Sequence, residues 1–216
     1  MTSLSTPARA ARLGTPRKRG VTLIEAVLYI SIALALIVGG LVFLQQASLA
    51  QRTNSAVRNV SAIASETRGL FQQSQNFIGL TEGTLINAGA VPSALVDTST
   101  NPASLKNEWG GLIVVASAPA GGGFAADSGF TVRYNNVPEA ACTRLTSTDI
   151  GGTGRVGSGI RLIAFGLPGD VLTGGTAPVD PTTTPLTGLL TPALVGGYCR
   201  PTGSTGTVDL MWTFNR

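Results

Sequence analysis

Residues 17–44 read RKRGVTLIEAVLYISIALALIVGGLVFL, a cluster of positive charge followed by a long apolar run. No charged residue occurs from Ala26 to Gln51, and residues 26–44 are apolar apart from one serine. At about 1.5 Å per residue, a helix over this run can cross a hydrocarbon core of about 30 Å. The basic residues directly before it, Arg17 to Arg19, predict a cytoplasmic N-terminus and an outward-facing C-terminal body.

An ordinary secretory signal peptide is an alternative explanation of this segment. It would be cut at the small-residue site Ser48-Leu49-Ala50, which would leave a secreted binding protein beginning at Gln51. The apolar run, however, is longer than the roughly 7–15 residues usual for a signal peptide. Glu25 also stands at its start, where an ionised carboxylate is costly in lipid unless it is paired or lies at the surface.

The same segment resembles the N-terminal signature of type IV pilins and pseudopilins, which has basic residues, Gly, a hydrophobic residue, Thr-Leu-Ile-Glu and a long apolar helix. The resemblance implies that prepilin peptidase cleaves after Gly20 and that Val21 becomes the N-terminus, usually N-methylated in the family. Glu25 is then the fifth mature residue, where the family has a nearly invariant glutamate. The implied partners are further copies of the chain in a helical polymer, prepilin peptidase, an inner-membrane platform protein and its assembly ATPase.

The chemistry of Val21 and Glu25 suits such a polymer. The terminal amine of Val21 and the carboxylate of Glu25 are opposite charges four residues apart. In the low-dielectric core of a fibre, Glu25 of one subunit can neutralise the amine of the next, and a misplaced subunit would leave a buried charge alone. The alternative is that Glu25 merely reaches the membrane surface.

Three departures from the commonest pattern resemble type IVb pilins, the class of enteric colonisation pili and conjugative thin pili. The leader of twenty residues is long, Val21 replaces the usual phenylalanine, and the mature chain is large. Further resemblance lies in Glu108-Trp109-Gly110-Gly111 and in the segment from Tyr134 to Cys142, which resembles the short helix that carries the first cysteine of type IVb heads. A minor pilin or a type II secretion pseudopilin would share the processing without forming the long fibre.

Charge and composition argue against nucleic-acid binding and catalysis. The formal net charge is +4, but five basic residues lie in the first twenty positions, and the remainder carries ten basic against eleven acidic residues. The absence of histidine excludes a Ser-His-Asp triad and imidazole metal ligands, so we expect no enzyme, no metal and no cofactor. The G-x-G-x-x-G pattern from Gly152 to Gly157 lacks a preceding strand and a following helix and is interpreted as a turn. Isolated acids (Asp127, Asp149 and Asp170) are interpreted as turn or surface residues, and Trp109 and Trp212 as core residues rather than sugar platforms.

The predicted fold is α+β, a long helical spine packed on an antiparallel β-sheet head. Apolar residues at three- and four-residue steps extend the helix from about Thr22 to about Gln73. Strands are predicted at 111–117, 130–134, 160–165 and 208–214, the last with alternating residues facing the spine. The domain prediction is a cleaved leader (1–20), a membrane or fibre-core segment (21–51) and a head (52–216).

One disulfide is predicted to close the C-terminal part of the head. Cys142 and Cys199 are the two cysteines of the chain, and the export signal places them in an oxidising compartment. The ring that they close would contain most of residues 166–197, a Gly-, Pro- and Thr-rich segment interpreted as a surface loop. The predicted location is the inner membrane for the precursor, with the head in the periplasm, and then an extracellular pilus.

Overall fold

The structure is a computed structural model that describes residues 22–120, 125–146, 159–168, 192–201 and 203–216. Contacts between Cα atoms divide the chain into two compact units, Met1–Gln45 and Gln46–Arg216.

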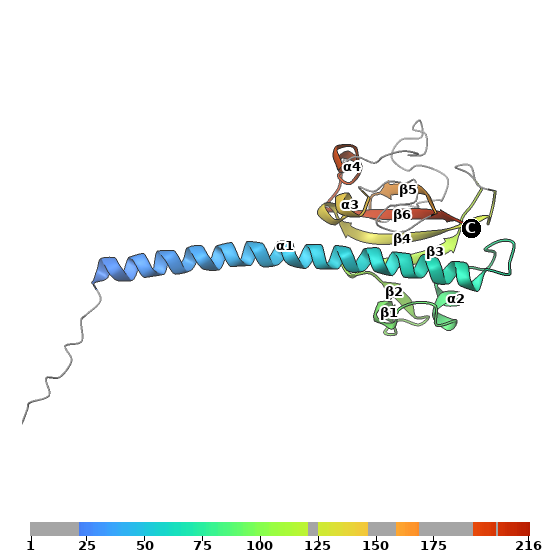
Figure 1. Cartoon of the computed structure of the whole chain (residues 1–216), viewed down its shortest axis with the longest axis horizontal. Coiled ribbons are helices and arrows are strands. Elements are labelled where there is room, and N and C mark those ends of the chain that lie inside the picture. The colour runs from blue at the N-terminus through green and yellow to red at the C-terminus, as the bar shows by residue number, and fades with distance from the viewer. Residues whose placement is uncertain (1–21, 121–124, 147–158, 169–191, 202) are drawn as a thin grey trace, which may run out of the picture. The chain divides into compact units, whose positions relative to one another are not determined.

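A helix of 48 residues, α1 (Leu23–Leu70), contributes to both units (Figure 1). It confirms the predicted long helix but ends at Leu70 rather than Gln73, directly after Gly69, a poor helix former. Its most apolar 18-residue window has a mean hydropathy of 2.7 and no buried residue. By length and composition, α1 can therefore cross a membrane.

The head, residues 46–216, contains a six-stranded antiparallel sheet in the order β1-β2-β3-β4-β6-β5. The four predicted strands are all present, and the antiparallel sheet is confirmed. Two short strands were not predicted, because two or three residues are too few to show a period of two. The strands are β1 (Val96–Asp97), β2 (Ser104–Lys106), β3 (Leu112–Ser117), β4 (Gly129–Pro138), β5 (Ile160–Gly166) and β6 (Thr207–Asn215).

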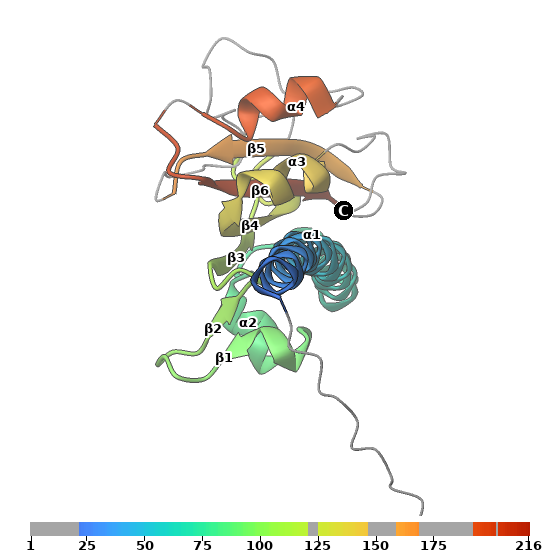
Figure 2. The ribbon, with the colours of Figure 1, turned by 90° about the vertical axis from the view of Figure 1, so that its left-hand side faces the viewer.

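One face of the sheet packs against the second half of α1. Directly paired residues of β4 and β6 share this face: Phe130 lies opposite Phe214, Val132 opposite Trp212, and Tyr134 opposite Leu210. All six are fully buried and form one core with Ala56, Val60, Ile63 and Ala64 of α1. Figure 2 looks along α1 and shows the sheet passing from β1 and β2 on one side of the helix to β6 and β5 on the other.

The predicted packing of alternate β6 residues against the spine is confirmed. The other face of the strand is buried as well, since Asp209, Met211 and Thr213 are as buried as Leu210 and Trp212. The reason is the place of β6 in the sheet, since it pairs with β4 on one side and β5 on the other. On its second face Met211 packs with Ala164 of β5, and Asp209 pairs with a charged residue of β4.

Four short helical segments occur among the described residues of the head. They are α2 (Glu82–Asn87), the 3₁₀ helix η1 (Ser93–Leu95), α3 (Glu139–Thr146) and α4 (Pro192–Tyr198). Helix α3 confirms the predicted short helix that carries Cys142. Helix α4 corrects the prediction of a surface loop over 166–197, whose end is helical although two glycines weaken the sequence signal. Residues 169–191 of that predicted loop lie outside the described residues.

Candidate assembly site and disulfide region

Glu25 lies in the first turn of α1 and is exposed. A carboxylate at this position interacts favourably with the positive end of the helix dipole. None of the ion pairs formed among the described residues involves Glu25, so its charge is available to a cation from elsewhere. The predicted cleavage residues Gly20 and Val21 lie outside the described residues.

The N-terminal part of α1 exposes apolar side chains all around the helix. Leu23 is 84% exposed and Leu36 is 71% exposed, although a globular chain normally buries such side chains. Large apolar surfaces of this kind mark contact with protein or membrane. The exposed set comprises Leu23, Ile24, Val27, Leu28, Tyr29, Ile30, Ile32, Leu34, Leu36, Ile37, Val38, Leu41, Val42, Phe43 and Leu44.

The predicted disulfide is present between Cys142 of α3 and Cys199, directly after α4. The two Cα atoms are 5.7 Å apart, and both cysteines are buried. The bond closes a ring with a sequence separation of 57 residues. It therefore holds α3 and α4 together. The ring that it closes contains the part of the chain with the weakest predicted secondary structure.

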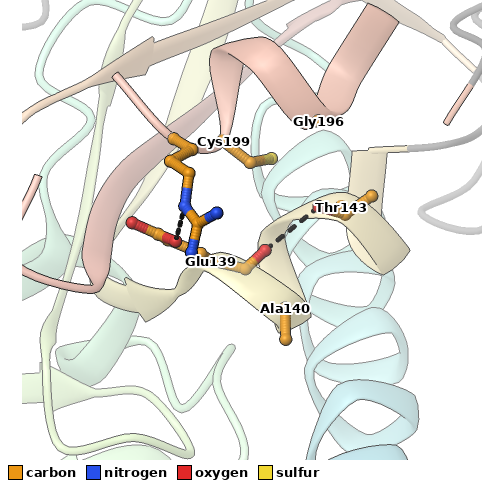
Figure 3. Close-up of a pocket in the computed structure, with 6 residues that line it drawn as sticks. Glu139, Ala140, Thr143, Gly196 and Cys199 are labelled. Carbon is orange, nitrogen blue, oxygen red and sulfur yellow. Dashed lines mark hydrogen bonds and ion pairs between the residues drawn. The ribbon is translucent and has the colours of Figure 1, made fainter. Parts of the chain in front are cut away.

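A polar cluster that the sequence analysis missed lies beside the disulfide (Figure 3). The Glu139 carboxylate accepts hydrogen bonds from Ser204 Oγ at 2.7 Å and from Arg200 Nε at 2.9 Å. These bonds, the one from Ser204 first, lower the pKa of Glu139 below its usual value. The cluster joins the start of α3 to the segment after Cys199, so it reinforces the same connection as the disulfide.

A shallow cavity of about 280 Å³ opens over this region. Glu139 and Arg200, two of its lining residues, form an ion pair, which Figure 3 shows as a dashed line. Within the part of the chain that the structure describes, no group of three or more His, Cys, Asp or Glu side chains gathers to hold a metal ion. The lining residues are Glu139, Ala140, Thr143, Gly196, Cys199 and Arg200.

The Glu108-Trp109-Gly110-Gly111 motif forms the turn between β2 and β3. Gly110 has a φ of +82°, and a Cβ on Gly111 would lie 1.9 Å from the Asn135 carbonyl oxygen, so both positions require glycine. Asn107 closes the turn by accepting hydrogen bonds from the backbone N–H groups of Trp109 and Gly111. The motif is therefore a structural turn that brings β3 close to β4.

Glu108 in this turn reaches across to α1. Its Oε1 accepts a hydrogen bond from Asn59 Nδ2, while Oε2 is buried with no hydrogen-bond partner. Burial raises the pKa of Glu108, and the bond from Asn59 opposes this effect only partly. Burial, and then the nearby Glu108, raise the pKa of Tyr134 well above its usual value.

A second unpredicted contact fixes the bulge in β4. Asp209 is fully buried and pairs with Arg133, and its Oδ1 also accepts a hydrogen bond from the backbone N–H of Asn136 at 2.9 Å. Asn136 has a φ of 56°, and the β4–β6 register shifts between Tyr134 and Val137. The sequence gives no signal for this contact, because Arg133 and Asp209 meet only once the strand register is known.

The other residues singled out in the sequence have structural roles, as far as they belong to the described part of the chain. Trp212 is fully buried, and Trp109 is half-buried against the core, which confirms the core interpretation. Asp127 adopts a φ of 58° in a turn, as predicted. The pattern from Gly152 to Gly157 lies outside the described residues, as do Asp149 and Asp170.

Comparison with solved structures defines the class of protein. A type IV b pilin from Salmonella typhi is 28% identical and superimposes with a TM-score of 0.51, over 75% of this chain and 99% of that chain. The long helix and antiparallel sheet described above are therefore the fold of a type IV pilin.

Sequence comparison identifies the family. Residues 50–163, more than half of the chain, match the family described as PilS N terminal, and the chain belongs to this family of pilins. The major structural subunit of the bundle-forming pilus of Escherichia coli O127:H6 (strain E2348/69 / EPEC) is 25% identical over 197 residues, which cover 88% of this chain and 92% of that protein. The corresponding protein of Escherichia coli O111:H- has the same identity and coverage.

Proposed function

We propose that this chain is the major structural subunit of a type IVb pilus, polymerised through the N-terminal part of α1. The observation that carries the proposal is the continuous apolar surface of α1, with Glu25 in its first turn. The surface spans lipid in the precursor and packs against other copies in the fibre. The related major subunits of Escherichia coli support a major rather than a minor role.

The proposed processing begins with a precursor held in the inner membrane, with its N-terminus in the cytoplasm and its head in the periplasm. Prepilin peptidase cuts after Gly20 and leaves Val21 as the N-methylated terminus. Glu25 then pairs with the terminal amine of a neighbouring subunit, which sets the axial position of each copy because an unpaired buried charge is costly. A platform protein and its ATPase move the subunit from the membrane into the extracellular fibre.

Mass analysis of the mature N-terminus tests the processing. We compare protein from cells with prepilin peptidase and from otherwise identical cells without it. Methylated Val21 as the first residue, found only with the peptidase, is the expected result. A chain that begins at Gln51 in both strains would instead identify a secreted protein with a conventional signal peptide.

The role of Glu25 needs a separate experiment. Glu25→Gln removes the charge but keeps the size of the side chain, so the protein should be processed normally while fibres on sheared cells become scarce. Glu82→Gln, in the head, is the matched control and should leave the fibre yield unchanged. Normal yield from Glu25→Gln would show that the terminal amine is neutralised by another group. Low abundance of wild-type protein in sheared fibres would indicate a minor pilin.

A further inference from the structure

The side of α1 that faces away from the sheet, between residues 51 and 70, carries charges of both signs. Arg52 and Arg58 lie towards the start of this segment and Glu66 towards its end, and all three are exposed. The opposite side of the same helix turns is buried in the head core. The exposed members of this outer side are Gln51, Arg52, Asn54, Arg58, Ser65, Glu66, Gly69 and Leu70.

These charges are not paired along the helix. Residues three or four apart are neighbours on a helix surface, yet no acid stands at either spacing from Arg52 or Arg58, and no base stands at either spacing from Glu66. Arg58 donates only a weak hydrogen bond to Ser55 Oγ at 3.3 Å.

Some charged groups elsewhere in the head form ion pairs. Three ion pairs join head residues within the described part of the chain, namely Lys106 with Asp97, Arg133 with Asp209 and Arg200 with Glu139. The outer side of α1 takes part in none of them. The outer side and the exposed apolar side chains of residues 23–44 belong to the same helix, α1.

We propose that the outer side of α1 binds a second copy of this chain in the fibre, with Arg58 of one copy facing Glu66 of the next. The inference rests on the proposed function, because it requires copies packed with their helices side by side and pointing the same way. It adds to that function a second contact that selects the axial position of each subunit.

Axial spacing supports this pairing. Two copies without axial displacement would set Arg58 against Arg58 and Glu66 against Glu66, which is repulsive. Arg58 and Glu66 are eight residues apart, so a displacement of about 12 Å along the helix brings opposite charges level.

The same direction of displacement suits the proposed pair at the N-terminus. In both pairs the cation precedes the anion in sequence, and the Val21 amine and Glu25 call for a displacement of about 6 Å. The arginine and glutamate side chains are long and flexible, so they can span the difference. Two independent pairs thus favour a neighbour displaced in one sense along α1.

Charge reversal in the full-length chain, in cells that assemble it, tests the proposal. Arg58→Glu alone and Glu66→Arg alone should each lower the yield of sheared fibres about fivefold, because each replaces an exposed attraction by repulsion at every added subunit. The double variant restores opposite charges and should recover most of the yield. Arg144→Glu, on the exposed side of α3, is the control for adding a negative charge and should assemble normally.

Unchanged yield of both single variants would overturn the proposal, and so would a double variant no better than the singles. The wild-type protein distinguishes failure of this proposal from failure of the proposed function. If the proposed function is wrong, the wild type itself will form no fibres or will not begin at Val21.

Cross-linking gives a second test that does not depend on yield. A chain carrying both Arg58→Cys and Glu66→Cys, with the native disulfide verified by mass, should form covalent multimers in intact fibres when treated with a short thiol cross-linker. Arg58→Cys alone, which would link only copies without axial displacement, should give few multimers. Equal multimer yields from the two chains would contradict the displaced contact.

Discussion

The two units of the chain differ in what they do with their apolar side chains: the head buries them, and the N-terminal unit exposes them. The head encloses Trp212, Phe130, Phe214 and their neighbours in one core with the second half of α1. The first half of α1 is more apolar, yet its large side chains are exposed. The described head core contains no side chain of the N-terminal unit, so we expect the head to fold by itself and the N-terminal segment to need lipid or other copies of the chain to cover it.

Removal of the N-terminal unit is expected to have the largest effect and tests this comparison directly. A chain that begins at Gln46 keeps every residue of the head core, so it should remain a soluble, folded monomer with an intact disulfide. It should form no fibres at all. Size-exclusion chromatography, near-UV circular dichroism and fibre shearing measure the three properties. An unfolded or aggregated product would show that the head depends on residues 1–45.

Truncation of single side chains compares the two units at one position each. Trp212→Ala removes a fully buried ring and should lower the free energy of unfolding of the head by about 3–5 kcal/mol. Leu36→Ala removes a side chain that is 71% exposed and should leave head stability unchanged. Urea unfolding of the full-length variants in detergent provides the measurement. A loss from Leu36→Ala comparable to that from Trp212→Ala would contradict the separation of the two units.

Removal of the disulfide tests how much the head relies on covalent closure. Replacing Cys142 and Cys199 together by serine opens a ring whose ends are 57 positions apart and should cost about 4 kcal/mol by the chain-entropy estimate. The reduced wild type under matching conditions is the control for the two serines. A loss well below this value would mean that Glu139, Ser204 and Arg200 hold α3 and the segment after Cys199 together without the bond.

Two glycines of the head should respond to alanine in opposite directions. Gly111→Ala places a Cβ 1.9 Å from the Asn135 carbonyl and should destabilise the head by at least about 2 kcal/mol through backbone strain. Gly196→Ala on α4 meets no atom within 4 Å and should stabilise the head by up to about 1 kcal/mol. Thermal unfolding of the two variants beside wild type checks both signs. Fibre yield then reports whether a neighbouring subunit requires the bare surface at Gly196.

The smallest expected effect is a change in pH dependence. Burial raises the pKa of Glu108, so the folded head favours the protonated carboxyl. This contribution to stability is present below the ordinary glutamate pKa of about 4.3 and is lost as the pH rises through the raised value. Glu108→Gln keeps an oxygen that accepts the hydrogen bond from Asn59 but does not titrate. The stability of this variant relative to the wild type should therefore increase with pH over that interval.

Urea midpoints at a series of pH values test the effect of Glu108. The lowered pKa values of Asp97 and Glu139 act in the opposite direction, but they cancel in the difference between variant and wild type. Glu66→Gln, on the outer side of α1, is the control for loss of a carboxylate. A difference that does not vary with pH would place Glu108 in contact with solvent.

Features with local signals were predictable from the sequence. The uncharged run after Glu25 and the apolar periodicity through Val60 and Ile63 predicted one long helix, and its end differs by three residues. The four longer strands were predicted from residues of high β propensity. The Cys142–Cys199 bond followed from a pair of cysteines in an exported chain.

Contacts between residues that are distant in sequence could not be predicted in this way. The burial of Met211 on the second face of β6 depends on where that strand lies in the sheet. Glu108 and Asn59 are 49 positions apart in sequence, and Arg133 and Asp209 are 76 positions apart. Helix α4 contains two glycines, so its propensity is weak and its position next to Cys199 and α3 stabilises it.

The sequence by itself determined that this protein has an apolar helix with an acid at its start, an α+β head and one disulfide. These properties depend on composition, hydrophobic period and residue type, which act over a few neighbouring positions. Tertiary structure alone decided that Asp209 is buried beside Arg133 and that Glu108 reaches α1. Those outcomes depend on strand register and helix rotation, which bring together residues that are distant along the chain.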